Sequence, residues 1–503
     1  MRRVLILPVI ALLAAGLPAS PASADSLLQI LEKAVRSDPL IREAEANRLA
    51  SREGKPIARG ALLPQINGSY SWQNADARGS NAFSQAVDND NDPSTPPVPT
   101  ILTRGFNSSR SDTLQWQVQL TQSVFRWDQW VRLGQADRQA AQADVDYQAA
   151  QQDLMVRVAE AYFNELAAED SLASAQASKE AIGRQLEQSN KRFEVGLIAI
   201  TDVQEAQAAY DQSIAAEILA KRTLANTKEA LRAIIDEYPA ELSKPALEIP
   251  LAVPVPADEA RWVDMAMQQN RTLISSQIAT EIAKDDVRLA RSGHYPSLDF
   301  VAGHSDVDVT GSQLTGFRPS AGLTNPAPFV RNPNDFTTIQ DSFGLQLSVP
   351  IFSGGTTSAK TQQAVYKHRA SRERLEQTAR ETERKTRDAY LAVLSDISSV
   401  KALKQAFESA KTALKATEAG YDVGTRTTVD VLNARQAVFT AETNYLRSRY
   451  DYLINGLQLK QAAGSLSTAD ISQIDALLTN TGPALPPQVD PGSTPATPGQ
   501  TTP

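Results

Sequence analysis

The stretch YDVGTRTTVDVLN, at residues 421–433, occurs twice in this sequence. The earlier copy, FEVGLIAITDVQE, spans residues 193–205, at a constant offset of 228. In each copy a glycine is followed by β-branched residues and then by an aspartate, Asp202 or Asp430. This order predicts the end of one helix, a short turn, and an Asp-capped start of the next helix. The repeat therefore predicts two helical hairpins whose tips are these two stretches.

The first 24 residues have the pattern of a secretory signal. Arg2 and Arg3 precede an apolar run at 4–17, and the small residues ASA follow at 22–24. This arrangement predicts cleavage before Asp25.

Composition narrows the function classes. Without Arg2 and Arg3 the chain has 48 basic and 58 acidic residues, a balance that argues against nucleic acid as a partner. No later stretch approaches the roughly 20 apolar residues of a membrane-spanning helix, so a membrane span would have to be made of strands. The absence of cysteine excludes disulfides and thiolate metal sites.

An enzyme is not expected. The three histidines, His294, His304 and His368, have no metal-ligand spacing, and no phosphate-binding loop, nucleophile elbow or dinucleotide fingerprint is present. We therefore predict no catalytic residues, no metal and no cofactor.

Strict alternation identifies strands. Leu114, Trp116, Val118 and Leu120 are separated by glutamines, which predicts one apolar and one polar face. The same alternation recurs before residue 352. The predicted strands lie at about 63–74, 111–125, 295–310 and 339–352, and the polar stretches 75–110 and 311–338 are predicted loops.

Long proline-free runs predict the helices. A helix over 128–193 would span roughly 100 Å, too long for an ordinary globular domain, and a second helical run covers 353–482. The predicted organisation is a signal peptide (1–24), a first repeat (25–238) with its hairpin tip at 193–202, a Pro-rich link (239–257), a second repeat (258–482) with its tip at 421–430, and a disordered tail (483–503).

Four strands cannot close a barrel, and open sheet edges cannot face lipid. Two copies would give eight strands, whereas three give twelve strands and room for a channel. We therefore expect an α+β membrane protein: a trimeric 12-stranded β-barrel, with four strands per chain, continued by a long α-helical coiled-coil barrel. The alternatives from the pattern alone are a soluble sandwich sheet and a helical fibre or repeat scaffold.

The tip stretches RFEVGLIAITDVQ and GYDVGTRTTVDVLNA, together with YLING at 452–456, carry a resemblance. The sequence resembles the TolC-type outer-membrane channel family over nearly all of its length up to the Pro-rich tail. The resemblance implies a homotrimeric exit duct for tripartite efflux pumps or type I protein secretion, in the outer-membrane lipid and the periplasm. It also implies two partners, a periplasmic membrane-fusion adaptor and an inner-membrane pump of the RND, ABC or MFS type. A non-conducting, adhesin-like surface or structural trimer is the alternative function.

The resemblance also implies a gate, through residues that pin the periplasmic end shut. These are Thr201, Asp202, Tyr421, Arg426, Gln185, Glu418 and Arg449. Tyr421 and Arg426 are expected to bond to the other hairpin, and an Arg426–Asp202 pair would be a charge-assisted hydrogen bond. Alternatively, Asp202 is only a helix N-cap whose capping box is completed by Glu205.

Two further sets follow from the resemblance. Asp430 matches a ring of carboxylates at the pore mouth, whereas Asn433 stands where the family type has a second acidic residue, so weaker cation selectivity is expected. For Asp430 the alternative is a plain helix cap. The expected adaptor-docking residues are Val195, Gly196, Leu197, Val423, Gly424 and Thr425, although the glycines could merely permit the turns.

Overall fold

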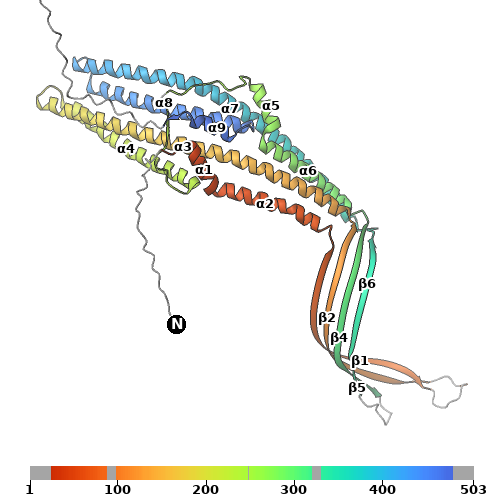
Figure 1. Cartoon of the computed structure of the whole chain (residues 1–503). Helices are drawn as coiled ribbons and strands as arrows, with labels where there is room; N and C mark the ends of the chain where they lie inside the picture. Colours follow the sequence, from red (N-terminus) through yellow and green to blue (C-terminus); the bar gives the residue numbers. More distant parts are fainter. Residues whose placement is uncertain (1–23, 88–93, 95–97, 247, 320–329, 480–503) are drawn as a thin grey trace, which may run out of the picture. The chain divides into compact units, whose positions relative to one another are not determined.

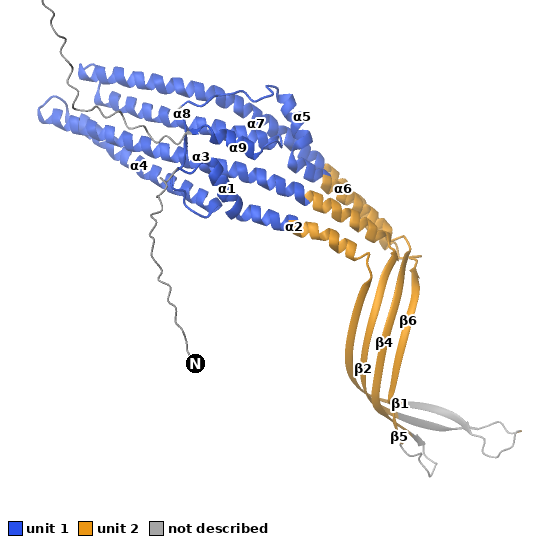
Figure 2. Ribbon diagram, in the orientation of Figure 1, with its two compact units in different colours: residues 1–48, 143–277, 374–503 blue, residues 49–142, 278–373 orange. Residues whose placement is uncertain are grey.

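A computed structural model describes residues 24–87, 94, 98–246, 248–319 and 330–479. The predicted signal peptide, apart from its last residue, and the predicted tail lie outside this part of the chain. Two compact units make up the structure (Figure 2). Unit 1 consists of residues 1–48, 143–277 and 374–503, and unit 2 consists of residues 49–142 and 278–373.

Unit 2 contains an antiparallel sheet (Figure 1). Strands β1, β2 and β4 lie side by side, and β4 pairs on its other side with β6 and, over four residues, with β5. The strands are β1 (Gln65–Val87), β2 (Val98–Phe125), β4 (Ser297–Pro319), β5 (Val330–Pro333) and β6 (Phe336–Ser348).

The strand ends correct the sequence prediction in both repeats. The β1–β2 ladder continues as far as Val87 opposite Val98, within the predicted loop 75–110. Likewise, β4 runs to Pro319 and β5 lies within the predicted loop 311–338, whereas β6 stops at Ser348 rather than 352. The ladder is held by backbone hydrogen bonds, so it persists where the side chains no longer alternate between apolar and polar.

One face of the sheet carries large apolar side chains that are exposed in the single chain. On β1, Tyr70 and Trp72 are opposite Trp116 and Leu114 of β2, so these four side chains share a face. Tyr70 is 70% exposed and Trp72 65% exposed. Further along the sheet, Phe343 on β6 is 85% exposed. Such a face requires an apolar environment.

The helices include two pairs that form the predicted hairpins, α3 with α4 and α7 with α8 (Figure 1). The full set is α1 (Leu27–Ser37), α2 (Pro39–Gly60), α3 (Trp127–Glu194), α4 (Ile200–Ile235), α5 (Glu259–Gln269), α6 (Arg271–Ser292), α7 (Thr356–Asp422), α8 (Thr428–Ala462) and α9 (Thr468–Asp475), with two-residue strands β3 (Lys244–Pro245) and β7 (Leu478–Thr479). Helix α3 coincides within one residue at each end with the helix expected over 128–193. Over the described residues, no helix combines the length and the apolar character needed to cross a bilayer.

The core of unit 1 gathers around the middle of α3. Tyr162 and Phe163 are fully buried, and the Phe163 ring stacks on Tyr450 of α8 with 5.8 Å between ring centroids. The Tyr162 hydroxyl donates to the carbonyl of Ser243 at 2.7 Å, in the Pro-rich link. Burial of such large rings is a main source of packing free energy, so this region fixes the two hairpins and the link against one another.

From this core towards the tips, α3 and α8 lie antiparallel and are joined by polar contacts. These contacts are Gln458–Glu160 at 2.7 Å, Tyr450–Asp170 at 2.6 Å, Ser174–Glu442 at 3.5 Å, and Arg435 to the carbonyl of Ala181 at 2.9 Å. The two hairpins of unit 1 are therefore in register along their length, and their tips lie at the same end (Figure 1).

Candidate functional site at the hairpin tips

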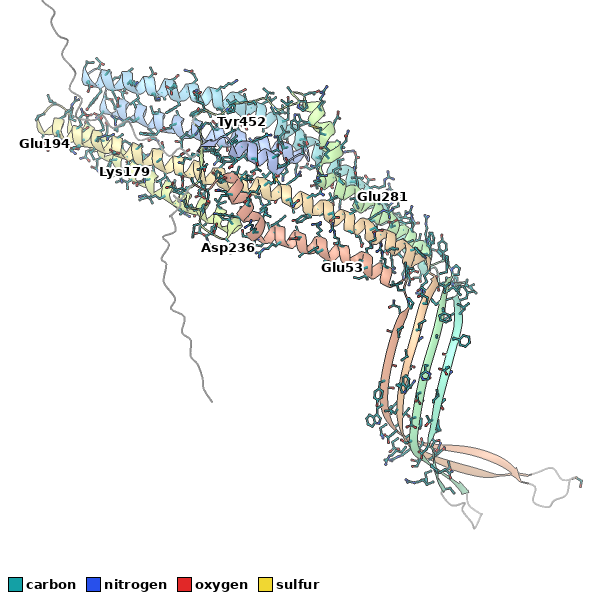
Figure 3. All side chains as sticks on the ribbon, in the orientation of Figure 1. Glu53, Lys179, Glu194, Asp236, Glu281 and Tyr452 are labelled. Atoms are coloured by element: carbon teal, nitrogen blue, oxygen red, sulfur yellow. The ribbon has the colours of Figure 1, made fainter. Side chains whose placement is uncertain are left out.

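The first tip is a glycine turn between α3 and α4. Glu194, labelled in Figure 3, is the last residue of α3. Gly196 has φ of 73°, in the left-handed region, and its amide donates to the carbonyl of Phe193 at 2.8 Å. Helix α4 begins at Ile200, two residues before Asp202, the residue expected to cap its start. Because L-residues rarely adopt this φ, the turn itself requires the glycine.

The second tip repeats this geometry. Gly424 has φ of 79°, its amide donates to the carbonyl of Tyr421 at 3.1 Å, and the next amide, of Thr425, donates to Gly420 at 2.8 Å. Both tips therefore end their first helix in the same way. Their second helices start differently.

In the second tip, Thr427 and Asp430 form a capping box. The Asp430 carboxylate accepts from the Thr427 amide at 2.9 Å and from its hydroxyl at 3.0 Å, and the Thr427 hydroxyl accepts from the Asp430 amide at 3.2 Å. The Thr427 backbone donor, followed by its hydroxyl, lowers the pKa of Asp430. Asp430 is the third residue of α8 and its carboxylate caps the helix as half of this capping box, as the helix-cap alternative expected.

In the first tip, the residue equivalent to Thr427 is Ala199, which has no side-chain group to cap the helix. The alternative that Asp202 is an N-cap with Glu205 is therefore wrong, because Ala199 is the N-cap and Asp202 is the third helical residue. Among the described residues, the Asp202 carboxylate has no hydrogen-bond or ion-pair partner. A charged group at a helix N-terminus is thus left available for a partner outside this chain.

The two tips are joined within the chain by Arg192. Its guanidinium lies over the ring of Tyr421, 4.7 Å from the centroid, and 3.9 Å from the carboxylate of Asp422. Tyr421 is 8% exposed, and its hydroxyl oxygen accepts a long bond of 3.5 Å from Thr428. Tyr421 does contact the other hairpin, but through Arg192 rather than through Thr201 or Asp202. A single cation–π contact of this kind contributes about 0.5–1 kcal/mol when it is partly exposed.

Arg426 is exposed at the second tip. The aliphatic part of its side chain packs against Gly420. A Cβ atom at position 420 would lie only 2.8 Å from the Arg426 Cγ, so a larger residue there would clash with this side chain. Within the described part of the chain, its guanidinium has no ion-pair partner, and Thr201 is exposed on the first tip. Asp202 and Arg426 are thus complementary charges, one on each tip, and among the described residues neither forms an ion pair or a side-chain hydrogen bond.

Behind the tips, Glu418 forms an ion pair with Arg435 at 2.8 Å. Arg449 does not join Glu418 in the single chain, since it lies fourteen residues beyond Arg435 on α8, or about 21 Å along the helix. It instead donates to the carbonyl of Ala246 at 3.1 Å. Arg435 was not identified from the sequence. The sequence does contain a feature that could have identified Arg435. Glu418 and Arg435 are the same number of residues from the turn, counted from the bond between residues 426 and 427, so the two helices of the hairpin bring them opposite each other.

Polar atoms without partners are buried at this joint. They are the Gln185 Nε2, the Ser189 Oγ and the Arg435 Nε, and both Gln185 and Ser189 are almost completely buried. A buried polar atom without a partner costs about 1–3 kcal/mol. The contact between the two hairpins is therefore less stable than expected from the amount of surface that it buries.

The predicted docking and pore-mouth residues are accessible. Val195, Leu197 and Val423 are 69–76% exposed apolar side chains at the tips. Asn433, on the first turns of α8, lines a groove of about 440 Å³ between α3, α4 and α8. The structure thus brings the predicted docking residues of both hairpins to one end of unit 1.

Long antiparallel strands with an exposed apolar face, combined with paired helical hairpins, define the class of outer-membrane channels with a helical tunnel. The chain belongs to the outer membrane efflux protein family, whose model matches residues 30–236 and 262–465. The two matched segments fall one in each repeat. It is an exit duct of the outer membrane for efflux and type I secretion, and the non-conducting surface protein is not favoured. Proteins of this family serve transport rather than catalysis.

Relatives of known name cover most of the chain. Outer membrane protein TolC of Vibrio cholerae is 36% identical over 94% of this chain and 98% of the relative. The alkaline protease secretion protein AprF of Pseudomonas aeruginosa is 30% identical over 90% of this chain and 86% of the relative. Among solved structures, the outer membrane channel CmeC of Campylobacter jejuni superposes with a TM-score of 0.64 at 16% identity, covering 94% of this chain and 98% of that chain.

Proposed function

We propose that three copies of this chain form one tube whose periplasmic end is held shut at the hairpin tips and opens when an adaptor docks there. The sheet supports the trimer, since β1 lies at one edge and β6 with β5 at the other. Unpaired edges cannot face lipid, because each free backbone group would cost several kcal/mol. Three copies join four long strands each into twelve, which is enough for a water-filled lumen.

One observation is the main support for a closed periplasmic end. Asp202 and Arg426 are opposite charges on the two tips, and neither has an ion-pair partner in the part of its own chain that the structure describes. In a ring of three copies, the Arg426 of one copy pairs with the Asp202 of the next, which closes the tube. Because both groups are near solvent, each such pair contributes only about 0–1 kcal/mol, so a docking partner can separate them.

The docking partner we propose is a periplasmic membrane-fusion adaptor that connects the tube to an inner-membrane pump. Val195-Gly196-Leu197 and Val423-Gly424-Thr425 present exposed apolar side chains on rigid glycine turns. A helical hairpin with apolar residues at its own tip would cover these side chains. Opening is then an outward movement of hairpins, with no covalent step.

Introduced cysteines test the gate, because the natural chain has none. Asp202→Cys with Arg426→Cys should form disulfides between copies on oxidation, giving a covalent trimer on a non-reducing gel. Single-channel conductance in a planar bilayer should fall on oxidation and recover with a reductant. Asp202→Cys with Lys415→Cys, whose second thiol lies back along α7, is the control and should not cross-link. Wild-type protein that passes no ions would refute the duct, and a lack of cross-linking would refute only the gate.

A further inference from the structure

Each of the four helices that adjoin the sheet in unit 2 carries at least one exposed basic residue near its strand-side end. Arg59 of α2 lies six residues before β1, and Arg291 of α6 lies six residues before β4. Arg132 of α3 and Lys360 of α7 both follow strands and are 228 residues apart, the offset of the hairpin tips. The position of a cation beside the sheet is thus repeated in both halves of the chain.

These cations are largely without partners inside the chain. Within the described ranges, Arg59, Arg291 and Lys360 have no ion pair or side-chain hydrogen bond. Arg132 has only a loose contact of 3.7 Å with Asp128, and its side chain is 59% exposed. By contrast, Arg126 at the end of β2 is held by the Asp299 carboxylate at 2.7 Å.

The helix dipole explains only half of this arrangement. Arg59 and Arg291 lie in the last turns of their helices, where a cation is favoured. Arg132 and Lys360 lie close to the first turns of theirs, where the dipole disfavours a cation. What the four residues share is therefore exposure on a helix next to a strand–helix connection, not their place within the helix.

Exposed aromatic side chains accompany the cations. Trp127 is 44% exposed, Trp130 is 55% exposed, and Tyr295, which contacts Trp127 edge-on at 6.3 Å, is 47% exposed. Tryptophan and tyrosine are favoured at the boundary between hydrocarbon and headgroups, where lysine and arginine reach phosphate. The strand–helix junction therefore combines the two side-chain types of a membrane interface.

We infer that Arg59, Arg132, Arg291 and Lys360 form a cationic belt that binds the phosphate groups of anionic phospholipid in the leaflet next to the helices. This rests on the proposed function, in which the strands of three copies span the membrane. With three copies the belt has twelve cations. It selects anionic over zwitterionic lipid and sets the depth at which the sheet leaves the membrane.

Lipid counting tests the belt. Purified protein is reconstituted in vesicles of equal phosphatidylglycerol and phosphatidylcholine, extracted in mild detergent, and the lipids retained per trimer are counted by native mass spectrometry. Phosphatidylglycerol should be enriched about fivefold, the factor that corresponds to about 1 kcal/mol per basic residue at the surface. The triple variant Arg59→Gln, Arg291→Gln and Lys360→Gln should remove most of the enrichment, because only Arg132 of the belt remains in each copy.

The matched control removes three exposed cations that lie deeper along α7, Lys367, Arg369 and Arg372, each changed to Gln. Like Arg59, Arg291 and Lys360, they have no ion-pair or side-chain hydrogen-bond partner in the described part of the chain. They lie at least seven residues, or about 10 Å, farther from the sheet than Lys360, so the enrichment should be unchanged. Equal loss in both variants, or no loss in the first, would overturn the belt. Conductance of the same preparations reports on the duct separately, since neither triple change touches the tips.

Discussion

Glu217 and Tyr445 occupy the same position in the two hairpins, 228 residues apart, and each joins the two helices of its own hairpin. Glu217 of α4 accepts from Lys179 of α3, labelled in Figure 3, at 2.7 Å and pairs with Lys221 of its own helix at 2.7 Å. These contacts, with Lys179 first, lower the pKa of Glu217 to about 2. The first hairpin is therefore closed by an ionic contact whose carboxylate is buried and whose two lysines remain partly exposed to solvent.

The second hairpin uses aromatic rings at this position. Tyr445 of α8 stacks on Phe407 of α7, with 6.3 Å between ring centroids and 18° between ring planes. Phe407 is the counterpart of Lys179 in the repeat, and Arg449, the counterpart of Lys221, lies 5.5 Å from the Tyr445 ring. The same backbone geometry is thus held by two different chemistries.

We predict that Glu217→Gln loosens the first hairpin and leaves the second unchanged. The variant loses the charge that holds Lys179, so amide hydrogen exchange should become faster in residues 209–223 and not in the equivalent 437–451. Tyr445→Ala is the reciprocal control and should accelerate only 437–451. If either variant accelerated amide exchange equally in both segments, the two hairpins would not be held by independent contacts.

The ionic contact also predicts how the first hairpin responds to solution conditions. Because the folded pKa of Glu217 is depressed, its stabilisation is complete above about pH 4.5 and is lost as the pH falls towards 2. Salt near 1 M, at which the screening length is about 3 Å, should accelerate exchange more in 209–223 than in 437–451.

Loss of the tip contacts should open the channel. Tyr421→Phe with Arg426→Ser removes a buried hydroxyl and the unpaired guanidinium proposed to hold the next copy. We expect higher single-channel conductance at rest, because each pair of Arg426 with the next copy contributes only about 0–1 kcal/mol and the pairs together bias a closed state. The phenylalanine ring keeps the contact with Arg192. Lys415→Ser, which removes an exposed cation away from the tip, is the control. Conductance that remains at the wild-type resting level would exclude these residues as the latch.

Helix lengths and tip turns could be predicted from the sequence because they depend on local chemistry. The proline-free run before residue 194 and the glycines at 196 and 424 act through neighbouring residues only, and α3 ends within one residue of the prediction. The strand ends could not be predicted, since the outer parts of β1 and β2 are paired by backbone groups that leave no pattern in the side chains.

The contacts at the tips were predicted only in part, because they depend on which residues face one another. The repeat located Asp202 and Asp430 at equivalent positions, but their roles differ because one N-cap is Ala199 and the other is Thr427. The ion pair of Glu418 with Arg435 joins residues seventeen apart. It could have been found by pairing opposite charges at equal distances from the tip, as the Lys179–Glu217 pair also could.

Asn433→Asp tests the proposed pore mouth. It would add a carboxylate one helical turn after Asp430, giving six instead of three in a trimer. We expect a trivalent cobalt complex to block the open channel at about tenfold lower concentration, since each added charge strengthens attraction in a confined pore. Gln436→Asp, a further turn along α8, adds the same charge away from the ring and should change block less. Unchanged block in Asn433→Asp would remove Asp430 and Asn433 from the pore mouth.

The last prediction concerns Glu165, a carboxyl buried in the core of unit 1. Glu165 lies on α3, is 2% exposed, and its Oε2 has no hydrogen-bond partner among the residues that the structure describes. Burial raises its pKa to about 7, with Lys228 acting in the opposite direction and Glu169 adding to the rise. The folded chain therefore holds a proton on Glu165 that the unfolded chain releases near pH 4.5.

A raised pKa makes the folded state less stable as pH increases. The contribution of Glu165 is neutral below about pH 4.5 and becomes unfavourable between there and pH 7, by up to about 3 kcal/mol. Glu165→Gln keeps the shape and removes the charge, so its thermal midpoint should exceed that of wild type at pH 8 and match it at pH 5. Glu53→Gln, an exposed carboxyl on α2 labelled in Figure 3, should shift the midpoint equally at both pH values. If the Glu165→Gln and wild-type midpoints instead run parallel from pH 5 to pH 8, Glu165 is ionised in the folded chain and another group must neutralise it there.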